Sequence, residues 1–594
     1  MKKIILLLPF VFLINTFYSQ VIVKITQSPN NPLLLGVIPS IWADPSVTGW
    51  STPDMTNATN AIEAELMFVD DATDTTIDVN GNPTWQDACE PVINDITGKI
   101  AVVYRSFCWH DIKANYAQQA GAIGVIIINR DPGPFAMGGS TVGSSVTIPV
   151  VSIGSDEGDE LRDFIAMGGV RAFIGTKVGL NVNDLGSSPA NIVMAHHTSI
   201  PSFLSTNGTE NALDLGMFIF NPGSNAQAGV TASVDINYNG SSVFSNSSIP
   251  LSFNAPVGVV VDTIYADLGV FSPSSWAAGE YNIRYQINLT NDEDTSDNVF
   301  ESRFSISPNI YAKSRIDSLY QPLKSTAYSL NESTTLYDDW ESCLVFKDAN
   351  ASRGIVQGMT FSCAPVNGAM SFEIIEIRAY EWNDVFADLS VSTPTFNALN
   401  QVGDAFYFYP DETENGVNIF LPFDAPFQLV DNQKYLFCVY NSSDELRIGY
   451  DVQLDYESTV NNYLQPIAPV KVLPNGQSPI WYWAGFGYDA TPSISVTIDM
   501  ITNVDGDNNM VVENTIPYPN PAKNLITIPV RKQIKGLVNI EIFDMLGKVV
   551  ASENNHLENG PIKINVASIP NGTYMVKLVF EDNSSDSFKI AINR

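Results

Sequence analysis

Positively charged residues are scarce in this sequence. Its 594 residues include 30 Lys and Arg against 64 Asp and Glu, which gives a formal net charge of -34 at pH 7. Proteins that bind nucleic acid need clustered cations to displace the counterions of the phosphates. The composition therefore excludes nucleic acid as a partner, and the acidity is interpreted as a solvated surface that keeps the chain soluble.

Long hydrophobic runs are also missing beyond the N-terminus. Lys2 and Lys3 precede an apolar stretch from Ile4 to Leu13, and polar residues follow at Ser19 and Gln20. This is the pattern of a secretory signal peptide over residues 1–19. The stretch is too short for a membrane span, and no later segment approaches 18 uninterrupted apolar residues. We expect an exported protein with no transmembrane segment in the mature chain.

Histidine is rare, and the motifs of the common peptidases are absent. The sequence contains no His-Glu-x-x-His pair and no Gly-x-Ser-x-Gly elbow, and its four histidines are His110, His196, His197 and His556. On a strand, the adjacent His196 and His197 would point to opposite faces and could not easily share a metal ion. We therefore expect no zinc or serine peptidase.

The five cysteines have an odd count, so at least one is unpaired. An exported chain permits disulfides. Cys108 lies two residues from His110, a spacing that could activate a thiolate, but an exported Cys108 with Cys89 as a candidate partner should be oxidised to a disulfide. Cys343 and Cys363, two strand residues around a turn near Ala351, are the natural second pair. The pairing of Cys438 is left open.

Abundant Asn, Ser, Thr, Gly, Pro and aromatic residues favour short strands joined by turns, and the length requires several domains. The fold class expected is therefore mainly β and multidomain. Residues 20–180 are the exception, because aliphatic strands at 99–105, 123–129 and 148–153 alternate with helical patterns.

This order of elements resembles a protease-associated (PA) domain. The matching residues are Cys89, Pro91, Gly98, Lys99, Arg105, Cys108, Lys113, Ala117, Ala120, Gly121, Ala122, Gly124, Asn129, Met137, Gly138, Ile148, Pro149 and Val151. The resemblance implies an α/β fold, a Cys89–Cys108 disulfide and a role in protein or peptide contact. Trp109 and His110 stand where the family usually has a small polar residue and Phe, which makes them candidates for a specific protein contact.

Two β-sandwiches are expected next. Residues 181–308 end in two long strands around an acidic turn, which resembles the closing hairpin of an immunoglobulin-like adhesion module. Residues 309–500 contain many long strands, which suggests a jelly-roll-like sandwich.

Two further motifs could bind ligands. The acidic runs at 291–298 and 503–510 offer hard oxygen ligands, and the weak calcium candidates are Asp292, Asp294, Asp297, Asp505 and Asp507. Neither run matches an EF-hand, and solvated turns are the simpler interpretation. Trp481 and Trp483 could form a platform that stacks on sugar rings, although core packing is the commoner role of such a pair.

Residues 501–516 are expected to be a polar linker to a small C-terminal β-sandwich at 517–594. This tail resembles the C-terminal sorting domain of type IX secretion cargo in Bacteroidetes. The motif residues are Tyr518, Pro519, Asn520, Pro521, Gly547, Lys548, Gly572, Tyr574 and Lys589. The resemblance implies export by the type IX machinery, usual removal of the tail, and release of the cargo or its attachment to the cell surface.

These observations favour a non-catalytic secreted or surface protein that uses a PA domain for protein or peptide contact. No cofactor is expected apart from the possible calcium. Two alternatives stay open: a polysaccharide-binding or adhesion protein that uses Trp481 and Trp483, and a hydrolase with an unrecognised site within 309–500.

Overall fold

The structure is a computed structural model of the chain. It describes residues 21–46, 49–73, 76–78, 81–330, 337–366, 370–371, 373–386, 394–463, 467–501, 517–528, 535–544, 548–558, 561–580 and 585–594. The predicted signal peptide, nearly all of the predicted linker, the calcium candidates Asp505 and Asp507, and the sorting-motif residue Gly547 lie outside these residues.

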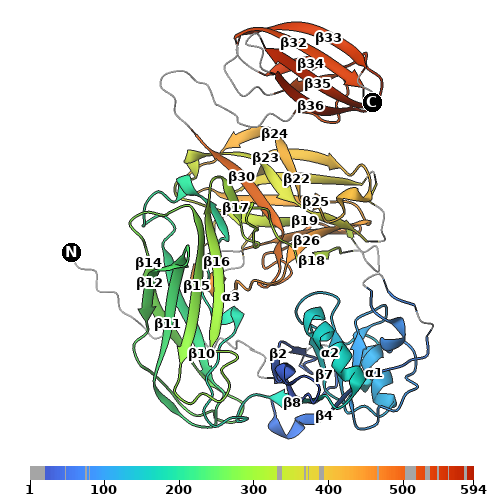
Figure 1. Cartoon of the computed structure of the whole chain (residues 1–594), viewed down its shortest axis with the longest axis vertical. Coiled ribbons are helices and arrows are strands. Elements are labelled where there is room, and N and C mark those ends of the chain that lie inside the picture. Colours follow the sequence, from blue (N-terminus) through green and yellow to red (C-terminus); the bar gives the residue numbers. More distant parts are fainter. Residues whose placement is uncertain are drawn as a thin grey trace.

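The N-terminal module, residues 21–176, is an α/β domain (Figure 1). Its eight-stranded sheet has the order β2-β1-β8-β4-β5-β6-β7-β3, and the neighbours from β4 to β7 run parallel. Strands β5, β6 and β7 are buried along their whole length, as continuous aliphatic runs predict for parallel strands covered on both faces. The elements are β1 (Val21–Gln27), β2 (Gly36–Ile38), β3 (Ile41–Trp42), β4 (Ile62–Phe68), β5 (Ile100–Tyr104), α1 (His110–Gln119), β6 (Gly124–Ile128), β7 (Val150–Ile153), α2 (Ser155–Met167) and β8 (Arg171–Thr176).

The first sandwich spans residues 181–308 and consists mainly of β-strands. Strand β11 alternates buried and half-buried residues from Val230 to Ile236, as the sequence pattern predicts for a strand with one face in the core. Its strands are β9 (Ser199–Pro201), β10 (Leu213–Asn221), β11 (Gln227–Tyr238), β12 (Ser241–Ser247), β13 (Leu251–Phe253), β14 (Asp262–Phe271), β15 (Gly279–Asn288) and β16 (Val299–Ser307).

The second sandwich spans residues 309–500 and contains a six-stranded sheet of order β23-β22-β25-β19-β27-β28. Its elements are β17 (Ile310–Ala312), β18 (Thr326–Tyr328), β19 (Tyr337–Phe346), β20 (Gly354–Phe361), β21 (Cys363–Pro365), β22 (Ile374–Trp382), β23 (Leu399–Phe408), β24 (Ile419–Gln428), β25 (Lys434–Asn441), β26 (Leu446–Asp451), α3 (Glu457–Tyr463), β27 (Val470–Pro474), β28 (Ile480–Tyr482), β29 (Thr491–Pro492) and β30 (Ile494–Met500).

One sheet joins the two sandwiches. Its path is β12-β11-β15-β16-β9-β17-β30-β20-β24, so it crosses the boundary that the sequence analysis placed at 308. Strand β9 makes the connection, because it pairs parallel with β16 and antiparallel with β17. A single hydrophobic core extends through both sandwiches, from Leu185 to Ile498. This continuity gives the two modules a shared core rather than a flexible joint.

The C-terminal module is a small sandwich with its own core. Its sheets have the orders β31-β34 and β33-β32-β35-β36. The strands are β31 (Leu525–Ile528), β32 (Lys535–Asp544), β33 (Val549–Glu558), β34 (Ile562–Asn565), β35 (Gly572–Phe580) and β36 (Ser585–Ile592). Within the described parts of the chain, no helix has the length and apolar character that a membrane span requires.

Candidate functional site

The segment that joins β5 to α1 is held by a disulfide. Cys108 bonds to Cys89 with 5.6 Å between the Cα atoms, as the PA resemblance implies. An oxidised sulfur cannot act as a thiolate nucleophile, so Cys108 and His110 do not form a catalytic pair.

A buried lysine contacts this disulfide and the backbone beside it. Lys113 of α1 is completely buried, and its Nζ donates a hydrogen bond to the carbonyl oxygen of Asp87 at 2.8 Å. The same Nζ lies 3.2 Å from Cys89 Sγ. Burial lowers the pKa of Lys113 to about 8, although Asp87 opposes that shift. The disulfide and the lysine together fix the backbone on both sides of Cys108.

Two aromatic side chains project from this rigid turn. Phe107 is 76% exposed and Trp109 is 56% exposed, which is unusual for such large apolar groups on either side of a disulfide. Phe107 was missed in the sequence analysis; its signal was a second aromatic residue two positions before Trp109.

His110 points the other way. It is half-buried, and its ring meets Phe135 edge-on at 4.9 Å between centroids. Burial, reinforced by the charge of Arg105, lowers the pKa of His110 to about 4. His110 is therefore neutral at pH 7 and packs inside the module, while Trp109 faces solvent.

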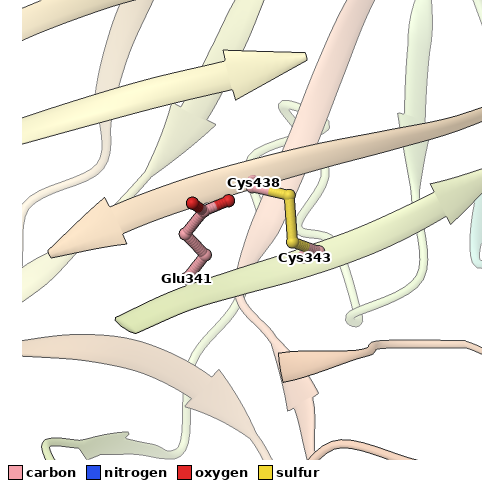
Figure 2. A group of neighbouring side chains, drawn as sticks. All are labelled: Glu341, Cys343 and Cys438. Carbon is pink, nitrogen blue, oxygen red and sulfur yellow. A yellow bond between two sulfur atoms is a disulfide. The ribbon is translucent and has the colours of Figure 1, made fainter. Parts of the chain in front are cut away.

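The second sandwich carries a cluster of charged residues around a second disulfide on the outer side of its six-stranded sheet. Cys343 on β19 is the direct cross-strand partner of Cys438 on β25, with 4.0 Å between Cα atoms, and the two form a disulfide (Figure 2). The predicted Cys343–Cys363 pair is therefore wrong. Cys363 lies on β21 in another sheet and faces the shared core as a buried free thiol.

Glu341 lies on β19 beside this disulfide (Figure 2). It is completely buried, and its Oε1 accepts hydrogen bonds from Arg378 Nη1 at 2.7 Å and from Lys471 Nζ at 2.8 Å. Its Oε2 is buried and has no hydrogen-bond partner. Arg378 also donates to Glu376 Oε2 at 2.5 Å and lies 3.6 Å over the ring of Tyr440.

The charged groups of this cluster neutralise one another, which is typical of a structural ion-pair network and not of an acid–base catalyst. Two carboxylates, Glu341 and Glu376, face the two cations Arg378 and Lys471. Burial opposes the charge of Arg378, but its hydrogen bond to Glu376 and the charge of Glu341 raise its pKa above the usual range. A carboxylate oxygen that already accepts hydrogen bonds from two cations is poorly placed to exchange a proton with a substrate.

Ligand atoms of Glu341, Cys343 and Cys438 lie within 4.8 Å of one another. Soft metal ions are bound by thiolates, however, and both sulfur atoms here are consumed by the disulfide. The oxidised cluster thus does not supply the ligand set of a zinc or copper site.

Trp481 and Trp483, the proposed platform for sugar rings, pack against different aromatic residues and do not form one flat surface. Trp481 on β28 stacks on Phe396 with 4.3 Å between centroids and 7° between planes. Phe396 in turn stacks on Trp382 at 4.6 Å. Trp483 lies beyond the end of β28 and contacts Tyr488 at 6.2 Å. One face of Trp481 is therefore covered by a protein ring instead of being open to a sugar.

The acidic hairpin turn between β15 and β16 gathers around a lysine that the sequence analysis did not connect with it. Lys177 Nζ lies 2.6 Å from Asp297 Oδ2, 3.3 Å from Asp294 Oδ2 and 3.0 Å from Asp184 Oδ1. Lys177 directly follows β8 and so belongs to the exit of the N-terminal module. Its contacts with residues about 120 positions later have no signal in the local sequence.

His196 and His197 lie in a loop before β9, buried against each other with 4.5 Å between ring centroids. Burial lowers the pKa of His196 to about 3 and holds that of His197 well below its usual value. Among the described residues, the one group of side chains close enough to share a metal ion is Glu341, Cys343 and Cys438, and it contains neither histidine. They are core residues here.

Comparison with protein families identifies two of the modules. Residues 59–161 match the PA domain model, and residues 517–593 match the model of the secretion system C-terminal sorting domain. The chain is an exported type IX secretion cargo with a PA domain. Type IX secretion delivers it to the cell surface or the extracellular space.

In the sorting domain, the described motif residues lie in strands or in the segments that lead into them. Tyr518 pairs through its backbone with Thr527, and Asn520 Oδ1 accepts a hydrogen bond from the amide of Ala591 at 2.6 Å. Tyr574 donates its hydroxyl hydrogen to the carbonyl of Pro570 at 2.9 Å. Gly572 begins β35, Lys589 lies on β36, and Lys548 directly precedes β33.

A comparison with curated proteins yields no match. Among solved structures, the chain is similar to an aminopeptidase from Aneurinibacillus sp. strain AM-1, with 23% identity over 27% of this chain and 30% of that one and a TM-score of 0.18. It is similar to a zinc aminopeptidase from Bacillus subtilis, with 22% identity over 26% of this chain and 29% of that one and a TM-score of 0.17. A third is dimeric latent PorU from Porphyromonas gingivalis, with 12% identity over 70% of this chain and 34% of that one and a TM-score of 0.14. The chain thus spans less than a third of either aminopeptidase.

Proposed function

We propose that this cargo is a non-catalytic binding protein whose PA domain contacts a protein or peptide through Phe107 and Trp109. The observation that carries the proposal is the exposure of both aromatic rings on a turn that the Cys89–Cys108 disulfide holds rigid. Rigid, amphipathic aromatic groups are typical anchors of protein interfaces because they bury much area while losing little conformational entropy.

The state of the candidate nucleophiles and acids supports the absence of catalysis. Cys108 is oxidised, His110 is neutral and packed on Phe135, and Glu341 is buried between Arg378 and Lys471. Each of these groups therefore has a structural partner in place of a substrate.

A hydrolase within 309–500 is the second candidate, because Glu341 and Glu376 converge on one guanidinium from different strands of a sandwich. Pairs of carboxylates catalyse glycoside hydrolysis when one of them can carry a proton. The ion pairs with Arg378 argue for a structural role instead.

The binding proposal is tested by selecting random dodecapeptides, displayed on phage, against the purified mature protein. Peptides that bind the wild type should lose at least tenfold in affinity for the double variant F107A/W109A. The matched control is L33A, since Leu33 is a 92% exposed apolar residue elsewhere on the same domain, and it should leave binding unchanged. Selected peptides that bind F107A/W109A as well as the wild type would contradict the assignment.

Hydrolysis is tested separately, with azocasein and with a set of nitrophenyl glycosides. We expect no turnover above the buffer control. Turnover that the variant E341Q abolishes while the protein stays folded would overturn the non-catalytic assignment and establish the hydrolase.

A further inference from the structure

Two acidic segments face each other at the exit of the PA domain. One is residues 181–187, which lead from β8 into the first sandwich, and the other is the hairpin turn 289–298 between β15 and β16. Glu293 links them twice, because its Oε2 accepts from the amide of Val182 at 2.8 Å and its own amide donates to the carbonyl of Asn183 at 3.0 Å. The amide of Ser187 donates to the carbonyl of Asp297 at 3.1 Å. The junction is therefore a defined structure rather than a loose linker.

The junction holds more negative charge than its lysine balances. The two segments carry five carboxylates, Asp184, Asp292, Glu293, Asp294 and Asp297, and the ammonium of Lys177 contacts three of them, Asp184, Asp294 and Asp297. The formal charges of these five carboxylates and the one ammonium sum to -4, although burial raises the pKa of Asp297 to about 7. Packing carboxylates this closely is costly unless a cation screens them.

Two oxygen atoms at the same place have no donor. Asp297 Oδ1 and Asn298 Oδ1 are both buried, and neither has a hydrogen-bond partner among the residues that the structure describes. Asn298 is only 5% exposed, and its Nδ2 donates to Asp292 Oδ2 at 3.0 Å, so its amide group is held against the acidic turn. A buried acceptor with no donor costs about 1–3 kcal/mol, and evolved structures usually supply a partner.

Two features surround the turn: a glycine that lets the backbone come close to Asp297, and a depression beside Asn298. A Cβ at Gly186 would lie 2.2 Å from Asp297 Oδ2, so only glycine allows the backbone to approach this carboxylate. A shallow depression of about 420 Å³ opens beside Asn298 and is also lined by Thr295. The depression thus reaches the turn at Thr295 and Asn298.

We propose that this junction binds a calcium ion through carboxylate oxygens of Asp292 and Asp297 and the amide oxygen of Asn298, beside the ammonium of Lys177. The ligands are hard oxygens in an irregular arrangement, which calcium accepts and magnesium does not. Extracellular calcium sites bind in the range of about 0.1 to 1 mM, which suits an exported protein. The bound ion neutralises charge on the hairpin turn, and that turn is hydrogen-bonded to the exit of the PA domain through Glu293 and Asp297.

The test is a calorimetric titration of the EDTA-treated mature protein with CaCl2, together with thermal unfolding in CaCl2 and in EDTA. The wild type should bind one calcium ion and unfold at a higher temperature in 5 mM CaCl2. D292N and N298S should each weaken binding at least tenfold; D292N removes a charge that does not contact Lys177, and N298S removes only the amide. The control is D505N/D507N, which removes the other calcium candidate of the sequence and should bind like the wild type.

Two results would overturn the proposal. One is a wild type that shows neither heat of binding nor a thermal shift with CaCl2, which would leave Lys177 as the sole counter-ion. The other is binding that is lost in D505N/D507N but kept in both D292N and N298S.

Discussion

Glu341 and Arg378 form an ion pair across the outer side of the six-stranded sheet, with 2.7 Å between Oε1 and Nη1. Arg378 lies on β22 and Glu341 on β19, so the pair bridges over the intervening strand β25. The pair therefore joins three strands that are far apart in the sequence.

Removing one member of this pair should destabilise the second sandwich strongly. In R378M, Glu341 stays buried with Lys471 as its remaining charged partner, and breaking a buried pair costs about 3–5 kcal/mol. The double variant E341Q/R378M should lose less than the sum of the two single variants. A double-mutant cycle from urea unfolding measures this coupling, and additive losses would contradict it.

The Cys343–Cys438 disulfide should contribute more to stability than Cys89–Cys108. The two cysteines are 95 positions apart, against 19 for the first pair, and closing the longer loop removes more entropy from the unfolded chain. The chain-entropy model assigns about 4 to 5 kcal/mol to a loop of that length. C343A/C438A should lower the unfolding midpoint more than C89A/C108A.

Thiol titration checks the same assignment independently. The native protein should show no reactive thiol, and the denatured, unreduced protein should show one, because Cys363 is free and buried. A denatured protein with three thiols would contradict the second disulfide.

Trp481 should matter for stability and not for glycan binding. Its ring stacks on Phe396, and aromatic stacks contribute about 1 kcal/mol beyond the area that they bury. W481A should therefore destabilise the sandwich by at least that amount, whereas Y482A, which alters a 49% exposed neighbour, should have little effect. A polysaccharide pull-down that W481A abolishes without unfolding would restore the sugar-platform hypothesis.

Lys313 should make stability rise with pH above neutrality. It is buried, its Nζ donates to the carbonyl of His196 at 2.8 Å, and burial lowers its pKa to about 7. Between this value and the ordinary pKa of about 10.5, the unfolded chain holds a proton that the folded chain lacks, so stability increases with pH in that window.

The increase from pH 7 to pH 9 should be about 2 kcal/mol larger in the wild type than in K313M. Chemical denaturation of both proteins at the two pH values measures the difference. Equal pH profiles would show that folding does not lower the pKa of Lys313. K313M should also be the more stable protein at pH 7, because it removes the cost of burying the amine.

Several features of the chain were decided by local sequence. The aliphatic runs at 123–129 and 148–153 are long enough and bounded clearly enough to predict buried parallel strands, and they form β6 and β7. The PA domain and the sorting tail were predicted from residues within about 100 positions of one another, and both family matches confirm them. Such modules fold around their own cores, so their patterns are complete within a short stretch.

Other features depend on contacts between distant segments. Strand register decides that Cys343 faces Cys438 and not the nearer Cys363, and register follows from which faces are buried in the assembled sheets. The same long-range packing places Lys177 in the acidic turn and Arg378 beside Glu341. The sequence by itself determined the modules, the export route and the first disulfide. Only the tertiary structure decided the second disulfide, the shared core and the charge clusters, because each requires strands about 40 to 120 residues apart to meet in one sheet or one junction.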